Sequence, residues 1–121
     1  MKKTIILDAN AILRYILYDI PEQADITEEI LLNEEVLILP EVLAEVVYVM
    51  NKSRNIPREK ISESILRFLN DAECKNDILI SAVKTFGNEN IDFVDCLLFA
   101  YSTQFEIFTF DDKLSKLIKS R

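Results

Sequence analysis

Short apolar runs alternate along the chain with longer segments in which apolar residues recur every three or four positions. Runs of four or five apolar or β-branched residues, bounded by polar residues or proline, are typical of buried strands. The three-to-four-residue spacing is typical of amphipathic helices. The pattern predicts strands at residues 4–7, 36–39 and 106–110, and a weaker strand at 72–74.

The helices are predicted from the same pattern and from its breaks. Pro21 and Pro40 suit the first turn of a helix, where the missing N–H of proline costs no hydrogen bond. Residues 55–57 and the loop around Gly87, the only glycine, interrupt the helical spacing. The predicted helices cover residues 9–18, 21–32, 40–52, 77–86 and 92–103, together with one that carries Ile61, Ile65, Phe68 and Leu69 on one face and a short one from Asp111 onward.

The alternation of short strands with helices predicts an α/β fold in which a mostly parallel sheet is covered on both faces. With 121 residues, half of them apolar, the chain is expected to form one domain over residues 1–121 with a packed core. No apolar run approaches the ~20 residues of a membrane span. The apolar stretch between Lys3 and Asp8 is too short for a secretory signal. We therefore expect a cytoplasmic protein.

Four carboxylates end or interrupt apolar segments. They are Asp8, Glu45, Asp95 and Asp111. An ionised carboxylate in such a position is costly unless it is paired or binds a cation, and Lys and Arg are scarce around all four. Asp8 and Asp111 follow predicted strands, and ligands bind beyond the carboxyl ends of parallel strands. We expect the four acids to meet in space and to share metal ions.

The chain has no histidine, and oxygen-only ligation favours Mg²⁺ or Mn²⁺ over zinc. Carboxylates that hold one or two such ions are a common means of activating water against a phosphodiester. Helix capping is the competing interpretation for Asp8 and Asp92, and Asp111 and Asp112 compete for one cap. Cys74 and Cys96 lack metal-ligand spacing and are interpreted as small core residues.

The net charge of −7 is unusual for a nucleic-acid-binding protein, because phosphate contacts need a basic surface. The basic residues, however, are grouped. One group surrounds a single loop and the other lies on the last segment; they are Lys52, Arg54, Arg58 and Lys60, and Lys113, Lys116, Lys119 and Arg121. Taken alone, both groups are interpreted first as the solvated ends of helices rather than as a nucleic-acid-binding surface.

Four motifs carry a resemblance to a known family. They are Leu7-Asp8-Ala9-Asn10, which resembles an opening D-x-N motif; Glu41–Tyr48, an acidic helix with Glu45; Asp92–Leu97 with Asp95; and Thr109-Phe110-Asp111, a strand-end T-x-D. In this order and spacing they are similar to the PIN-domain nucleases, in particular the small VapC-type toxins of prokaryotic toxin–antitoxin pairs.

The resemblance implies a three-layer α/β/α fold and a Mg²⁺- or Mn²⁺-dependent endoribonuclease that uses metal-activated water. It implies a homodimer that a cognate antitoxin holds inactive. The four acids would be the catalytic metal ligands, with Asn10, Asp92 and Thr109 as second-rank residues that orient water or an acid. Asp112 leaves open which residue of the pair faces the metal. The helices near residues 22–32 and 41–52 also carry an excess of apolar side chains, which predicts interfaces; these are Ile26, Ile30, Leu31, Val47, Tyr48 and Met50.

Two other functions compete with the toxin interpretation. A metal-binding receiver domain of a signalling protein also places acids at strand ends, but it needs an acidic pair after the first strand and a lysine late in the sheet. Here Ala9 follows Asp8, and residues 106–110 contain no lysine. A PIN-domain nuclease that processes RNA without an antitoxin has the same four acids, so the sequence does not separate it from a toxin.

Overall fold

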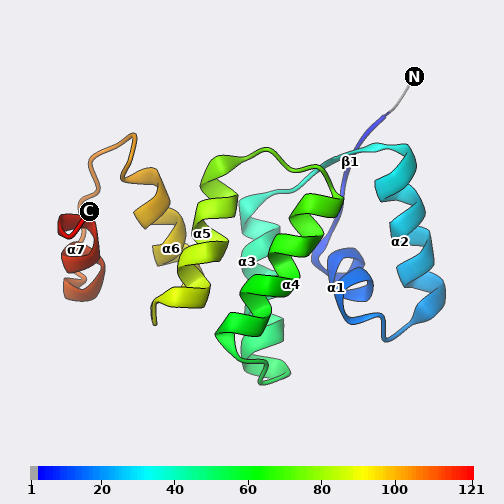
Figure 1. Ribbon diagram of the computed structural model, residues 1–121, viewed down its shortest axis with the longest axis horizontal. Coiled ribbons are helices and arrows are strands. Elements are labelled where there is room, and N and C mark those ends of the chain that lie inside the picture. Colours follow the sequence, from blue (N-terminus) through cyan, green and yellow to red (C-terminus); the bar gives the residue numbers. More distant parts are fainter. Residues whose placement is uncertain (1–2) are drawn as a thin grey trace.

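Two short strands pair in parallel towards one end of the molecule (Figure 1). They are β1 (Thr4–Ile6) and β2 (Glu35–Leu37), with Ile5 opposite Val36. The computed structural model describes residues 3–121, and within this range these two strands form the whole sheet. The α/β class with a short parallel sheet is therefore confirmed.

Helices make up most of the described chain. They are α1 (Ala9–Leu17), α2 (Pro21–Asn33), α3 (Pro40–Tyr48), α4 (Arg58–Asp71), α5 (Asp77–Asn88), α6 (Phe93–Tyr101) and α7 (Asp112–Lys119), and a π-helical turn, η1 (Val49–Ser53), extends α3. Pro21 and Pro40 occupy the first turns of their helices, as predicted. No helix among residues 3–121 is long and apolar enough to cross a bilayer.

The core lies between the helices and one face of the sheet. Ile5 and Val36 pack against it, whereas Ile6 and Leu37 on the opposite face are exposed. The largest fully buried side chains include Phe68 of α4. The helical stripes predicted from the three-to-four-residue spacing thus form the core, while one face of the sheet stays open in this chain.

Two predicted strands are wrong. Residues 72–74 form a turn in which Glu73 has a left-handed backbone (φ 54°), a conformation that does not fit an extended strand. Residues 106–110 are coil with no strand partner. A segment becomes a strand only when another edge accepts its hydrogen bonds, and the local pattern does not contain that information.

The only glycine lies where two helices approach each other closely. Gly87, near the end of α5, lies against Ser62 of α4, and a Cβ at position 87 would stand 2.7 Å from the Cβ of Ser62. The left-handed turns are instead made by Tyr18, Asn55 and Glu73. The one residue without a side chain therefore serves helix packing rather than turn formation.

Candidate functional site

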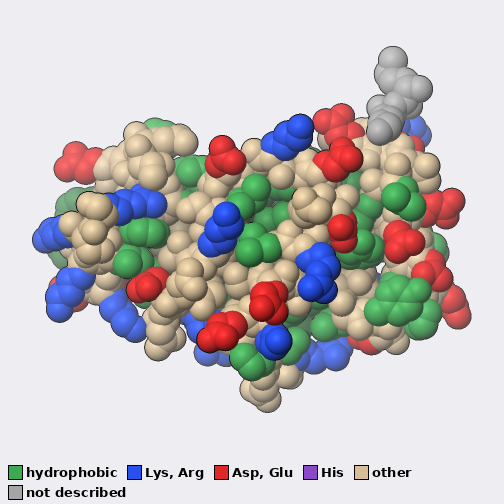
Figure 2. All heavy atoms as spheres, in the orientation of Figure 1, with side chains coloured by type: hydrophobic (Ala, Val, Ile, Leu, Met, Phe, Trp, Pro, Cys, Tyr) green, Lys and Arg blue, Asp and Glu red, His purple; other side chains and the backbone are tan. Residues whose placement is uncertain are grey.

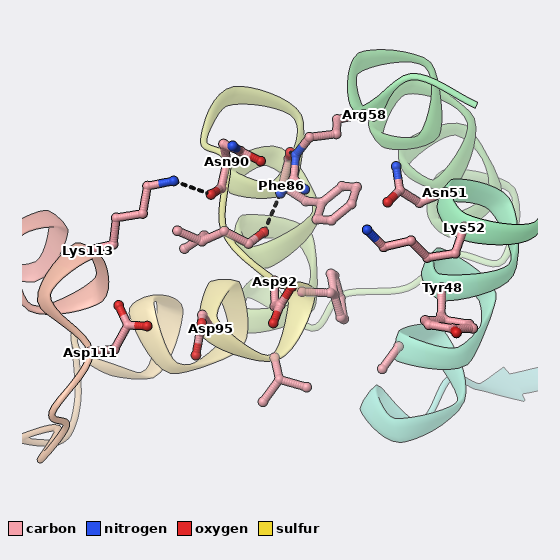
Figure 3. Close-up of a pocket in the computed structure, with 14 residues that line it drawn as sticks. Tyr48, Asn51, Lys52, Arg58, Phe86, Asn90, Asp92, Asp95, Asp111 and Lys113 are labelled. Carbon is pink, nitrogen blue, oxygen red and sulfur yellow. Dashed lines mark hydrogen bonds between the residues drawn. The ribbon is translucent and has the colours of Figure 1, made fainter. Parts of the chain in front are cut away.

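A pocket of about 540 Å³ opens between the C-terminal part of α3, the start of α4 and the first turn of α6 (Figure 3). Its lining combines carboxylates, cations and aromatic rings. The lining residues are Ala44, Tyr48, Asn51, Lys52, Arg58, Phe86, Asn90, Ile91, Asp92, Phe93, Val94, Asp95, Asp111 and Lys113. Three of the acids predicted from the sequence, Asp92, Asp95 and Asp111, thus share one pocket.

Asp95 is the carboxylate most affected by this environment. It lies in the first turn of α6 and is half-buried. Burial raises the pKa of the Asp95 carboxyl, and the negative charges of Asp111 and then Asp92 raise it further. Ionising Asp95 therefore costs more free energy in this pocket than in water.

Asp111 begins α7 and is brought to the pocket by the chain that follows α6. Its carboxylate accepts a hydrogen bond from the backbone N–H of Leu114 at 2.8 Å, which makes it the N-cap of α7. The hydroxyl of Thr109 accepts from the backbone N–H of Asp111 at 3.0 Å and fixes the turn before the helix. Asp111 rather than Asp112 is therefore the capping residue and the one that lines the pocket.

The other two predicted acids lie outside this lining. Asp8 is exposed and caps α1, where its carboxylate accepts from the backbone N–H of Ala11 at 2.9 Å; Asn10 is exposed beside it. Glu45 is exposed on α3, while Ala44 and Tyr48 of the same helix line the pocket. The expectation that all four acids gather is therefore not met within the single chain.

A divalent cation needs several oxygen donors placed close together. Carboxylate oxygens suit Mg²⁺ or Mn²⁺, but among residues 3–121 no group of three or more acidic or cysteine side chains is placed to hold a metal ion. Asp95 and Asp111 supply the right donor type in too small a number. One chain in this arrangement therefore does not fit the ion.

The basic group around residues 52–60 divides into different roles. The guanidinium of Arg54 donates to Asp19, and Lys60 pairs with Glu63 on the surface. Arg58 donates to the backbone carbonyls of Phe86 and Ile91 and is a structural residue. Lys52 remains as the member of the group that is exposed at the pocket and available for a ligand.

The sequence pattern does not single out several of the lining residues. It predicts Tyr48 at an interface and gives no signal for Asn51, although both face the pocket (Figure 3). The π-helical turn at Val49–Ser53 places Asn51 at the pocket, and the spacing of apolar residues does not predict such a turn. Lys113, a member of the last basic group, also lines the pocket, and its Nζ donates to the carbonyl of Asn90 at 2.7 Å.

The two cysteines have the expected structural character. Cys96 is buried in α6, and burial raises the pKa of its thiol to about 12. Cys74 is half-buried in the turn before α5. Neither is bonded in a disulfide, and a thiol with so high a pKa is a poor nucleophile and metal ligand.

Comparison with known proteins identifies the family of the chain. Residues 5–119 match the family described as the PIN domain, which covers almost the whole chain. No curated protein and no solved structure matches it.

Proposed function

Because this chain belongs to the PIN domain family, whose members are generally nucleases that use divalent metal ions, we propose that it is a Mg²⁺- or Mn²⁺-dependent endoribonuclease acting in the cytoplasm. Its catalytic metal ligands are Asp8, Glu45, Asp95 and Asp111. The observation that carries the proposal is the placement of Asp95 and Asp111 in one pocket, where burial, followed by the negative charges of Asp111 and Asp92, raises the pKa of Asp95.

The rest of the pocket supports a nucleic-acid strand as substrate. Lys52 and Tyr48 lie across the pocket from Asp95 and Asp111 (Figure 3). A lysine there can neutralise a phosphate, and the exposed ring of Tyr48 can stack on a base. The negative net charge does not oppose this, because the four proposed metal ligands contribute to it themselves.

The toxin role is the finer part of the proposal. Apolar side chains exposed on α2 suit a partner protein: Ile26 is 61% exposed and Leu32 is exposed further along the helix. Val47 and Met50, which were expected at the same interface, are buried in the core instead. An antitoxin that covers the remaining patch and extends an Arg or Lys towards the acids would replace the charge of the cation and inhibit the enzyme.

Cleavage of RNA by purified protein tests the activity. We expect cleavage with Mn²⁺ or Mg²⁺, its loss in chelator, and its loss in Asp95→Asn. Asp112→Asn is the matched control because Asp112 is exposed, neighbours Asp111 and does not line the pocket. Full activity in chelator, or in both Asp8→Asn and Asp95→Asn, would refute the proposal.

Induction in a bacterial host separates the toxin from an RNA-processing nuclease. A toxin arrests growth when the wild type is induced, and Asp95→Asn abolishes the arrest. An RNA-processing enzyme cleaves RNA in vitro but permits growth on induction, and mapping of RNA ends then identifies its target.

A further inference from the structure

The segment Glu106–Phe110 has the alternation of a strand but pairs with nothing in this chain. Within residues 3–121, residues 106–110 form no backbone–backbone hydrogen bond. Phe108 is 82% and Phe110 is 92% exposed, and their ring centroids are 5.1 Å apart. Exposure alternates along these residues, as it does along a strand. The two rings, two positions apart and in contact, form a single apolar face that water surrounds.

A matching surface exists on the sheet. β1 pairs with β2 along one edge, and the described chain supplies no strand to its other edge. On the open face of the sheet, Ile6 is 54% and its register partner Leu37 is 47% exposed. A free strand edge beside exposed apolar residues is a template for an added strand.

The two surfaces are kept apart within one molecule. Figure 1 shows α6 and α7 at one end of the long axis and β1 and α2 towards the other, with α5, α4 and α3 between them. The C-terminal end is held in place by its own contacts: Lys113 donates to the carbonyl of Asn90, and the guanidinium of Arg121 lies 3.9 Å from the centre of the Phe99 ring.

The two ends carry opposite charge. α2 contains four acidic residues and no basic one, whereas the last segment contains Lys113, Lys116, Lys119 and Arg121. Figure 2 shows acidic side chains gathered at the end that carries α2 and basic ones around the end that carries α7. Two copies placed side by side in opposite directions therefore bring complementary ends together twice, which closes a two-fold dimer.

We propose that two copies of this chain exchange their C-terminal segments, so that residues 106–110 of each copy add in parallel to the free edge of β1 in the other. Phe108 and Phe110 then cover Ile6 and Leu37 across the interface. The unpaired backbone groups of residues 106–110 and of β1 obtain hydrogen bonds that neither has alone. We assign a second copy of this chain to the free edge of β1 because that copy carries an exposed, unpaired segment, residues 106–110, with the apolar face formed by Phe108 and Phe110.

The exchange also completes the site, a consequence that rests on the proposed function. In a parallel pair the two strands end at the same edge of the sheet, which brings Asp111 of one copy to Asp8 of the other. Asp95 accompanies Asp111, since both line one pocket. Asp8 and Glu45 of the other chain belong to α1 and α3, which pack against each other. Each site then takes two acids from each copy, and this explains why one chain alone holds too few.

Disulfide cross-linking tests the exchange without reference to activity. Ile6→Cys and Phe108→Cys are made in separate chains of different tag length, with Cys74→Ala in both, then refolded together under mild oxidation. We expect a covalent heterodimer in the mixture, and far less homodimer from either chain alone. When both cysteines are placed in one chain, a cross-linked monomer or the absence of any cross-link would overturn the proposal.

Solution mass gives a second, independent reading. We expect a dimer at micromolar concentration for the wild type and a folded monomer for Phe108→Lys with Phe110→Lys, because both rings are exposed in the single chain and do not support its core. Phe105→Lys, exposed but outside the segment, is the matched control and stays dimeric. A wild-type monomer, or a dimer that survives the double substitution, contradicts the exchange.

Complementation tests the shared site. Asp8→Asn and Asp111→Asn are inactive alone, but a mixed dimer refolded from both contains one site with all four acids, so cleavage returns. If the cross-link forms and the mixture stays inactive while the wild type cleaves RNA, the shared site is wrong. If the wild type itself does not cleave RNA, the proposed function fails and the cross-link alone decides the exchange.

Discussion

The guanidinium of Arg58 lies over the ring of Phe86, 3.7 Å from its centroid, and its Nε donates to the carbonyl of the same residue at 3.0 Å. A second N–H of Arg58 donates to the carbonyl of Ile91, just before α6. One side chain at the start of α4 therefore joins the end of α5 to the loop that positions Asp92 and Asp95.

Replacing Arg58 is expected to loosen this joint. Arg58→Lys keeps the charge but loses the planar fork that reaches two carbonyls and stacks on the ring, so we expect about 1–3 kcal/mol less free energy of unfolding. Denaturation by urea measures it. Lys60→Gln, whose surface pair with Glu63 is 3.7 Å long, should change stability by less than ~0.5 kcal/mol. Equal effects of the two substitutions would contradict the structural role of Arg58.

The raised pKa of Asp95 predicts that replacing this residue increases thermal stability by an amount that depends on pH. Because the folded-state pKa lies above the unfolded value, the wild type gains stability as pH falls through the folded-state pKa towards the unfolded one, and that gain is absent at neutral pH. Asp95→Asn should therefore raise the melting temperature of metal-free protein at pH 7, with a difference that shrinks under acid. Asp112→Asn should show no such trend. A lower melting temperature for Asp95→Asn at pH 7 would mean that the carboxylate is a structural partner.

Tyr15 provides a pH test on the alkaline side. Its hydroxyl donates to Asp71 at 2.7 Å, and burial, followed by this hydrogen bond, raises the pKa of the phenol to about 12. An unfolded tyrosine ionises near 10, so this group contributes stability that is lost as pH rises from about 10 to 12. Tyr15→Phe should cost about 1 kcal/mol at pH 7 and should flatten that alkaline loss. An unchanged alkaline profile in Tyr15→Phe would refute the assignment.

Lys52 is expected to contact the phosphate backbone of the substrate. Lys52→Gln should weaken RNA binding and reduce the slope of log affinity against log salt by about 1, since one phosphate contact is lost. Lys60→Gln, on a cation that already faces Glu63 and lies outside the pocket lining, is the matched control. If both substitutions alter the slope equally, the effect is one of net charge and the pocket is not the binding groove.

Much of the fold was predictable because it depends on local chemistry. Pro21 and Pro40 suit the first turn of a helix by their own backbone geometry, and the apolar spacing of Ile61, Ile65 and Phe68 already contains the buried face of α4. The strand predicted at residues 106–110 is wrong for the opposite reason, because it depends on a partner elsewhere. Their alternation is that of a strand, but a strand needs an edge to pair with, and in this chain no edge lies within reach.

Local sequence order also predicts only part of the candidate site. Asp95 and Asp111 come together because α6 and α7 follow each other closely in the chain, so short-range order is sufficient. Asp8 and Glu45 lie on elements far away in sequence, and only the packing of the C-terminal part decides whether they join. Asn51 and Lys52 reach the pocket on a π-helical turn that does not appear in the helical spacing.

The three left-handed residues have a practical consequence for engineering. Residues other than glycine and asparagine are strained in the left-handed conformation by about 1–2 kcal/mol. Tyr18 and Glu73 adopt it. Tyr18 has a reason to stay, since its hydroxyl donates to Asp25 at 2.5 Å. Glu73 is exposed, and neither a hydrogen bond from its side chain nor an ion pair is formed in the described chain. Asparagine at position 73 would relieve the strain without glycine's added backbone freedom, so heat tolerance can be improved at a turn remote from the pocket lining and from the C-terminal segment.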